Sequence, residues 1–136
     1  MTMIGGMPAG APALDGQSVL VVEDEFLVAE LVCEAVARLG GKVMGPAPSI
    51  EAALEMLEAE RPDIALLDVN LGGQRVFPLA DALWRAHVPF AFTSGYHSGF
   101  IEQRFKAVPH LEKPFSTPSL ERVLRDLVQA PERELK

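Results

Sequence analysis

The chain has 136 residues, 49% of them hydrophobic and 23% charged, a balance typical of one globular domain with a substantial core. Its formal net charge of -7 argues against nucleic acid or an anionic membrane as a direct partner and is compatible with a site that binds cations. The single cysteine, Cys33, cannot form an internal disulfide, which fits a cytoplasmic protein, and no apolar run approaches the roughly 20 residues that span a bilayer.

The two ends of the chain differ in composition from its centre. Residues 1–16 are rich in Gly, Ala and Pro and contain no Lys or Arg, so they lack the positive region that begins a signal peptide. We interpret residues 1–16 as a flexible N-terminal tail and residues 17–130 as one folded domain. The polar residues 131–136 are interpreted as a C-terminal tail in solvent.

Between these tails, patterns typical of strands and helices alternate. Continuous apolar runs predict buried strands, and two shorter runs predict short strands. The expected strands are 18–23, 42–45, 63–68, 89–94 and 109–112. Apolar residues at helical spacing predict helices, with Ser49 and Thr117 as N-caps and a weaker pattern at 99–107. The other expected helices are 26–40, 50–60, 76–87 and 117–130.

This order of elements predicts an α/β fold. Continuous apolar strands that alternate with helices form a parallel sheet covered on both faces, and right-handed crossovers make the arrangement doubly wound. In such folds the functional site lies at the carboxyl ends of the strands, where the strand order reverses.

Residues with reactive or charged side chains stand at these strand ends. They are Glu23-Asp24-Glu25, Asp68, Thr93-Ser94-Gly95 and Lys113-Pro114. If the first and third strands are neighbours, three carboxylates converge, and a divalent cation would relieve their repulsion. Oxygen ligands alone suit Mg²⁺. A hydroxyl and an ammonium group on the other side suit a phosphoryl group, whose oxygens need donors and positive charge.

Four segments, VLVVEDE, LLDVNLGG, FTSGY and EKPF, resemble in order the four motifs of response regulator receiver domains. The resemblance covers about residues 17–130. It implies a flavodoxin-like (βα)5 sandwich with a central five-stranded parallel sheet in the order 2-1-3-4-5. The stretch between Ser94 and Lys113 is short and contains two glycines, so we expect its fourth helix to be short or mobile.

The resemblance also implies a role for each matching residue. Asp68 would be the phosphoacceptor, taking a phosphoryl group from a kinase phosphohistidine. Mg²⁺ would be bound by Glu23, Asp24, Asp68 and the backbone carbonyl of Asn70. The phosphoryl oxygens would be contacted by Lys113 and Ser94, and the Lys113–Pro114 peptide bond would be cis.

The segment PFAFTSGY departs from most receivers and resembles the FATGUY subfamily, whose members are often single-domain regulators partnered with HWE-type histidine kinases. Ser94 and Tyr96 would then be the switch residues. His110 stands where most receivers have an aromatic switch residue, and we expect it to be a structural or surface residue. Gly72-Gly73 replace a common proline, so we expect a less fixed loop there.

The predicted function is a stand-alone receiver of a two-component phosphorelay. Its partner would be a histidine kinase or a histidine phosphotransfer protein. It would signal through protein contacts or act as a phosphate sink, because the sequence after the last helix has no room for a DNA-binding domain. Three alternatives stay open. A haloacid dehalogenase-like phosphatase would need an acid where Asn70 stands. The others are a binding-only pseudo-receiver and a receiver cut from a hybrid kinase.

Overall fold

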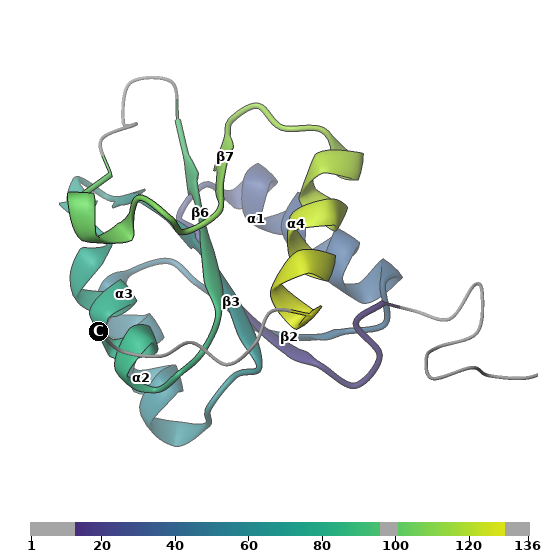
Figure 1. Cartoon of the computed structure of the whole chain (residues 1–136), viewed down its shortest axis with the longest axis horizontal. Coiled ribbons are helices and arrows are strands. Elements are labelled where there is room, and N and C mark those ends of the chain that lie inside the picture. The colour runs from purple at the N-terminus through teal and green to yellow at the C-terminus, as the bar shows by residue number, and fades with distance from the viewer. Residues whose placement is uncertain (1–12, 96–100, 130–136) are drawn as a thin grey trace, which may run out of the picture.

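A five-stranded parallel sheet forms the centre of the computed structural model, which describes residues 13–95 and 101–129 (Figure 1). The strands lie in the order β2-β1-β3-β6-β7. Their bounds are β1 Ser18–Val22, β2 Lys42–Ala47, β3 Ile64–Asp68, β6 Phe90–Ser94 and β7 His110–Glu112. The predicted order 2-1-3-4-5 is confirmed, because β4 and β5 form a separate hairpin outside this sheet.

Four α-helices in the described part of the chain cover the two faces of the sheet. They are α1 Phe26–Arg38, α2 Ile50–Ala59, α3 Phe77–Arg85 and α4 Thr117–Gln129. In Figure 1, α1 and α4 lie on one side of the sheet and α2 and α3 on the other. Because side chains alternate along each strand, each face has its own buried core, as in a doubly wound sandwich. None of the described helices combines the length and the apolar character that crossing a membrane requires.

One 3₁₀ turn, η1 Gln103–Phe105, is the helical structure between β6 and β7 in the described residues. The expected short fourth helix is thus reduced to a single turn there. Phe105 is buried and belongs to an aromatic cluster, with ring centroids 5.7 Å from Phe77 and 5.7 Å from Phe92. Arg104 donates to both carboxylate oxygens of Asp81 on α3, at 3.2 and 2.8 Å, and ties this turn to the helix layer.

The structure corrects the predicted start of the domain. Leu14, placed by the sequence in the flexible tail, is fully buried in the core beneath α1 and α4. Its backbone N–H donates to the carbonyl of Leu39 at 2.8 Å. Residues 13–16 therefore belong to the folded domain. A single leucine within a Gly- and Pro-rich segment has no periodicity to mark it as core, although burying it contributes roughly 1.5–3 kcal/mol.

The predicted N-cap of α2 is confirmed, whereas that of α4 lies one residue earlier than predicted. The Ser49 hydroxyl accepts the Ala52 N–H at 3.1 Å, which confirms this predicted N-cap. Thr117 was expected to cap α4, but it is the first helical residue. Ser116 caps the helix instead, because its hydroxyl accepts the Ser119 N–H at 3.2 Å. Two hydroxyl residues in succession satisfy the same sequence rule, and only the backbone decides between them.

Candidate functional site

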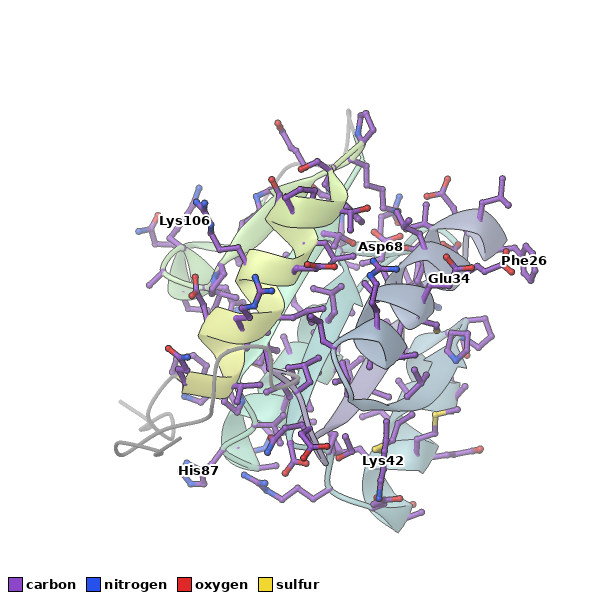
Figure 2. All side chains as sticks on the ribbon, turned by 90° about the vertical axis from the view of Figure 1, so that its right-hand side faces the viewer. Phe26, Glu34, Lys42, Asp68, His87 and Lys106 are labelled. Carbon is purple, nitrogen blue, oxygen red and sulfur yellow. The ribbon has the colours of Figure 1, made fainter. Side chains whose placement is uncertain are left out.

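The carboxylates of Glu23 and Asp68 meet at one edge of the sheet. Val22 on β1 is opposite Leu67 on β3, so the next residue of each strand emerges at the same edge. Both side chains are buried, with Glu23 5% and Asp68 4% exposed. Figure 2 shows Asp68 in the same half of the domain as Phe26, the first residue of α1, and far from Lys42 and His87. The predicted convergence of these two acids is therefore observed.

Lys113 completes this cluster from the end of β7. Its Nζ lies 3.1 Å from Asp68 Oδ2, 3.1 Å from Glu23 and 2.6 Å from Glu25 Oε1. Its side chain is 13% exposed, so most of its contact is with protein rather than water. The Lys113 backbone N–H donates to the Ser94 carbonyl at 2.8 Å, and the Lys113–Pro114 peptide bond is cis. One ammonium group thus faces three carboxylates.

Burial changes the protonation of the cluster. It raises the pKa of Glu23 to about 7, and the nearby charge of Asp68 adds to this effect. The backbone N–H of Glu25, which donates to Glu23 at 3.0 Å, and the Lys113 ammonium act in the opposite direction. Burial by itself would lower the pKa of Lys113, but its hydrogen bonds to Glu25, Asp68 and Glu23 raise it overall. The ammonium therefore stays charged at neutral pH while Glu23 is close to its midpoint.

Asp24 does not join the acidic cluster. Carboxylate oxygens of Glu23, Glu25 and Asp68 lie within 4.8 Å of one another, in an arrangement that could hold a metal ion. Asp24 is exposed, and its Oδ2 accepts the Gly72 N–H at 2.9 Å. The sequence prediction named Asp24 and not Glu25 as a metal ligand, and Asp24 in that role stays a prediction. The signal available was the run Glu23-Asp24-Glu25, in which the longer Glu25 side chain reaches back toward Lys113.

A short hairpin follows Asp68 and holds one of its oxygens. Strands β4, Asn70–Leu71, and β5, Gln74–Arg75, pair in antiparallel fashion around Gly72 and Gly73. Both glycines have positive φ, 54° and 88°, as a two-residue type I′ turn requires. The Asn70 N–H donates to Asp68 Oδ1 at 3.2 Å. The segment expected to be a less fixed loop is therefore a hydrogen-bonded turn, and the Asn70 carbonyl as a metal ligand stays a prediction.

Ser94 is fully buried at the end of β6, and its hydroxyl contacts His110 rather than the acidic cluster. The Ser94 Oγ and His110 Nε2 lie 2.5 Å apart. Sequence reasoning expected His110 to be a structural or surface residue and gave it no partner in the site. The predicted contact between Ser94 and a phosphoryl group stays a prediction, and Tyr96, the other predicted switch residue, lies outside the described residues.

The family model of the response regulator receiver domain matches residues 19–125. The chain belongs to this family. The receiver is 33% identical over 114 residues to the positive alginate biosynthesis regulatory protein of Pseudomonas aeruginosa, a match that covers 79% of this chain and 46% of that protein. It is 28% identical over 111 residues to the sensory transduction protein LytT of Bacillus subtilis, with 79% and 46% covered. The chain thus spans about half the length of these curated relatives.

The receiver also resembles a solved structure that it covers almost completely. The solution structure of SdrG from Sphingomonas melonis Fr1 is 34% identical and superposes with a TM-score of 0.75, covering 85% of this chain and 98% of that one. The predicted family and its fold are therefore confirmed. Receiver domains are phosphoacceptors that bind Mg²⁺ in an acidic pocket, and the oxygen-only donor set of buried Glu23, buried Asp68 and exposed Glu25 fits such a hard cation.

Proposed function

We propose that Asp68 accepts a phosphoryl group from the phosphohistidine of a histidine kinase or a histidine phosphotransfer protein. The observation that carries this proposal is the buried Asp68 carboxylate with Lys113 Nζ at 3.1 Å, at the end of β3 in a receiver fold. In the transfer, the P–N bond of phosphohistidine breaks and a P–O bond to Asp68 forms. The imidazole leaves with the electron pair of the broken bond, and a proton from solvent can neutralise it.

The residues around Asp68 orient it and balance charge. The Asn70 N–H holds Oδ1 at 3.2 Å, while Oδ2 faces Lys113. This pairing orients the carboxylate, and the ammonium stands where negative charge arrives with the phosphoryl group. Ser94, the next residue after the strand position opposite Asp68, is proposed to donate its hydroxyl to a phosphoryl oxygen once phosphorylation has occurred.

A magnesium ion is proposed at the acidic cluster. Glu23 and Asp68 would hold it together with the Asn70 carbonyl, and when bound it would neutralise charge on the phosphoryl oxygens. Asp24 remains a proposed ligand. Its Oδ2 already accepts the Gly72 N–H, so its contribution would use the other oxygen or require release of that bond. Glu25 is the competing acid, since it already belongs to the cluster.

The output of the receiver is proposed to be contact with another protein, or removal of phosphate from a shared pathway. Two observations support this. The net charge of -7 disfavours direct binding of nucleic acid. The receiver matches 98% of the solved chain of SdrG, which supports a proposal in which the receiver acts without an attached output domain. The FATGUY-like segment makes an HWE-type histidine kinase the proposed upstream partner.

Phosphorylation by a small-molecule donor tests the acceptor without knowledge of the kinase. The protein is incubated with phosphoramidate and Mg²⁺, and its intact mass is measured with and without acid or hydroxylamine treatment. Wild type is expected to gain one labile phosphoryl group and Asp68→Asn none. Asp126→Asn, which removes an exposed carboxylate on α4, is the matched control and is expected to match wild type. A labile phosphoryl group on Asp68→Asn would overturn the proposal.

The metal ligands are ranked by titration. Mg²⁺ binding is measured by calorimetry for wild type, Glu23→Gln, Asp24→Asn and Glu25→Gln. The proposal requires weaker binding in Glu23→Gln. Of Asp24→Asn and Glu25→Gln, the variant that loses more Mg²⁺ affinity identifies the second acid that binds the metal. Unchanged affinity in Glu23→Gln would contradict a site at this cluster, while the phosphoacceptor assignment would stand on the mass measurement alone.

A further inference from the structure

The Ser94 hydroxyl has a defined partner, His110. Ser94 is fully buried, whereas His110, the first residue of β7, is exposed. The Ser94 Oγ lies 2.5 Å from His110 Nε2, a short hydrogen-bond distance. Among the residues that the structure describes, the Ser94 side chain makes this one hydrogen bond. The hydroxyl therefore depends on a residue outside the acidic cluster.

The burial of Ser94 indicates the direction of this bond. A hydroxyl carries one hydrogen, and a buried polar hydrogen without an acceptor costs roughly 1–3 kcal/mol. If Nε2 is unprotonated, Ser94 donates to it, and the exposed His110 ring can direct its Nδ1–H toward water. If Nε2 carried the hydrogen, the Ser94 hydrogen would have no acceptor among the described residues. The satisfied arrangement has Ser94 as donor and His110 as acceptor.

Phosphorylation would create a competing acceptor for that single hydrogen. Phosphoryl oxygens on Asp68 only accept, so Ser94 can donate to them only after it releases His110. We propose that His110 is a positioning residue that holds the Ser94 hydroxyl away from Asp68 in the unphosphorylated receiver. This hydrogen bond disfavours the arrangement in which Ser94 donates to a phosphoryl oxygen on Asp68. This inference rests on the proposed phosphoacceptor function and adds a residue that regulates it.

The backbone makes this competition local. The Ser94 carbonyl accepts the Lys113 N–H at 2.8 Å, and Ser94 is opposite Glu112 in the β6–β7 pair. The main chain of Ser94 is thus fixed beside the residue that contacts Asp68, while its side chain is held by His110. Rotation of the Ser94 side chain can exchange one partner for the other without rearranging the strands. The two partners are therefore alternatives for the same hydroxyl.

Binding of beryllofluoride with Mg²⁺, a stand-in for the phosphoryl group, tests the inference. Affinity is measured by nuclear magnetic resonance titration of the full chain. His110→Phe removes the acceptor and is expected to bind about fivefold more tightly, or better, the equivalent of one net hydrogen bond. His110→Gln restores an acceptor and is expected to lose most of this gain. His87→Asn, a histidine change near the opposite end of the sheet from Asp68, is the matched control (Figure 2).

A second background separates loss of the restraint from other effects of the substitution. In Ser94→Ala the hydroxyl is absent, so His110→Phe is expected to change affinity less than twofold. The ¹⁵N resonances of the His110 ring should show an unprotonated Nε2 in the free protein and change when beryllofluoride binds. An equal gain in the Ser94→Ala background, or no gain in His110→Phe, would overturn the inference. If wild type binds no beryllofluoride, or binds it equally in Asp68→Asn, the proposed function fails as well.

Discussion

Replacing Lys113 by Met tests the charge balance of the site most directly. Methionine keeps a similar length but removes the ammonium that contacts Asp68, Glu23 and Glu25. The first two carboxylates are 5% and 3% exposed as side chains, so the variant leaves buried negative charges beside each other. Glu25 is 61% exposed and can turn to water, so its pairing contributes little.

The size of the loss follows from the burial of the two acids. Removing one partner of a buried ion pair costs about 3–5 kcal/mol, because the remaining charge is uncompensated. Glu23, whose pKa is raised to about 7, can escape part of this cost by taking up a proton. We therefore expect a loss of about 3 kcal/mol in the free energy of unfolding at pH 8. The loss should be smaller at pH 5, where Glu23 is protonated in both proteins.

Urea denaturation in the presence of a chelator measures this loss. Lys106→Met, at an exposed lysine, is the control and is expected to change stability by less than about 0.5 kcal/mol. Added Mg²⁺ should restore part of the stability of Lys113→Met by supplying positive charge to the same carboxylates. A loss at pH 8 no larger than that of the control, or a loss that grows as the pH falls, would refute this account of the site.

Three further predictions concern pH, packing and backbone. Between pH 4.5 and about 7 the folded protein keeps a proton on Glu23 that the unfolded chain releases, so the free energy of unfolding of the metal-free protein should fall as pH rises through this window, by at most about 3 kcal/mol. Denaturation curves at a series of pH values should show a weaker pH dependence of this free energy for Glu23→Gln. An unchanged pH dependence in Glu23→Gln would contradict this cause. Phe105→Ala should cost about 3–5 kcal/mol in urea denaturation, because Phe105 is 2% exposed within the aromatic cluster; a loss under 1 kcal/mol would show that this turn is not part of the core. Gly45→Ala should destabilise far more than Gly72→Ala in thermal denaturation, since a Cβ at Gly45 would lie 2.7 Å from the Ala47 nitrogen whereas one at Gly72 meets nothing within 4 Å; equal losses would be inconsistent with the structure.

The central sheet was predictable because its strands have a simple pattern. The run at 63–68 is apolar without interruption until Asp68, and a strand buried on both faces needs such a run. Leu14 and the β4–β5 hairpin were not predictable in this way. Leu14 is a lone apolar residue, and strands of two residues are too short for alternation to be seen. The pair Gly72-Gly73 is typical of a tight turn, whereas the sequence prediction took it as a sign of a less fixed loop.

In the site, residues placed by the strands were predictable from the sequence, whereas the side-chain directions of residues in the loop after β1 were not. Asp68 is the last residue of β3 and Lys113 directly follows β7, so the parallel arrangement of the strands brings both to one edge of the sheet. Asp24 and Glu25 come two and three residues after the end of β1 and directly before α1. No periodicity fixes their directions there. In the structure the Gly72 N–H holds the Asp24 carboxylate, and the Glu25 carboxylate lies 2.6 Å from Lys113 Nζ.

These backbone contacts connect the acidic cluster to the surface around it. Asp24 holds the β4–β5 hairpin through Gly72, and Lys113 holds the end of β6 through the Ser94 carbonyl. The bond from the Gly72 N–H to Asp24 is a hydrogen bond to a charged group and contributes roughly 1.5–3 kcal/mol, so a change in the charge that Asp24 faces can alter its stability; the bond from Lys113 to the Ser94 carbonyl joins neutral backbone groups. Ser94 adds a third connection, because releasing His110 frees a side chain on the exposed start of β7. If Asp68 is phosphorylated as proposed, the modification would act on the β4–β5 hairpin and on the start of β7 through single hydrogen bonds, without displacement of the sheet itself.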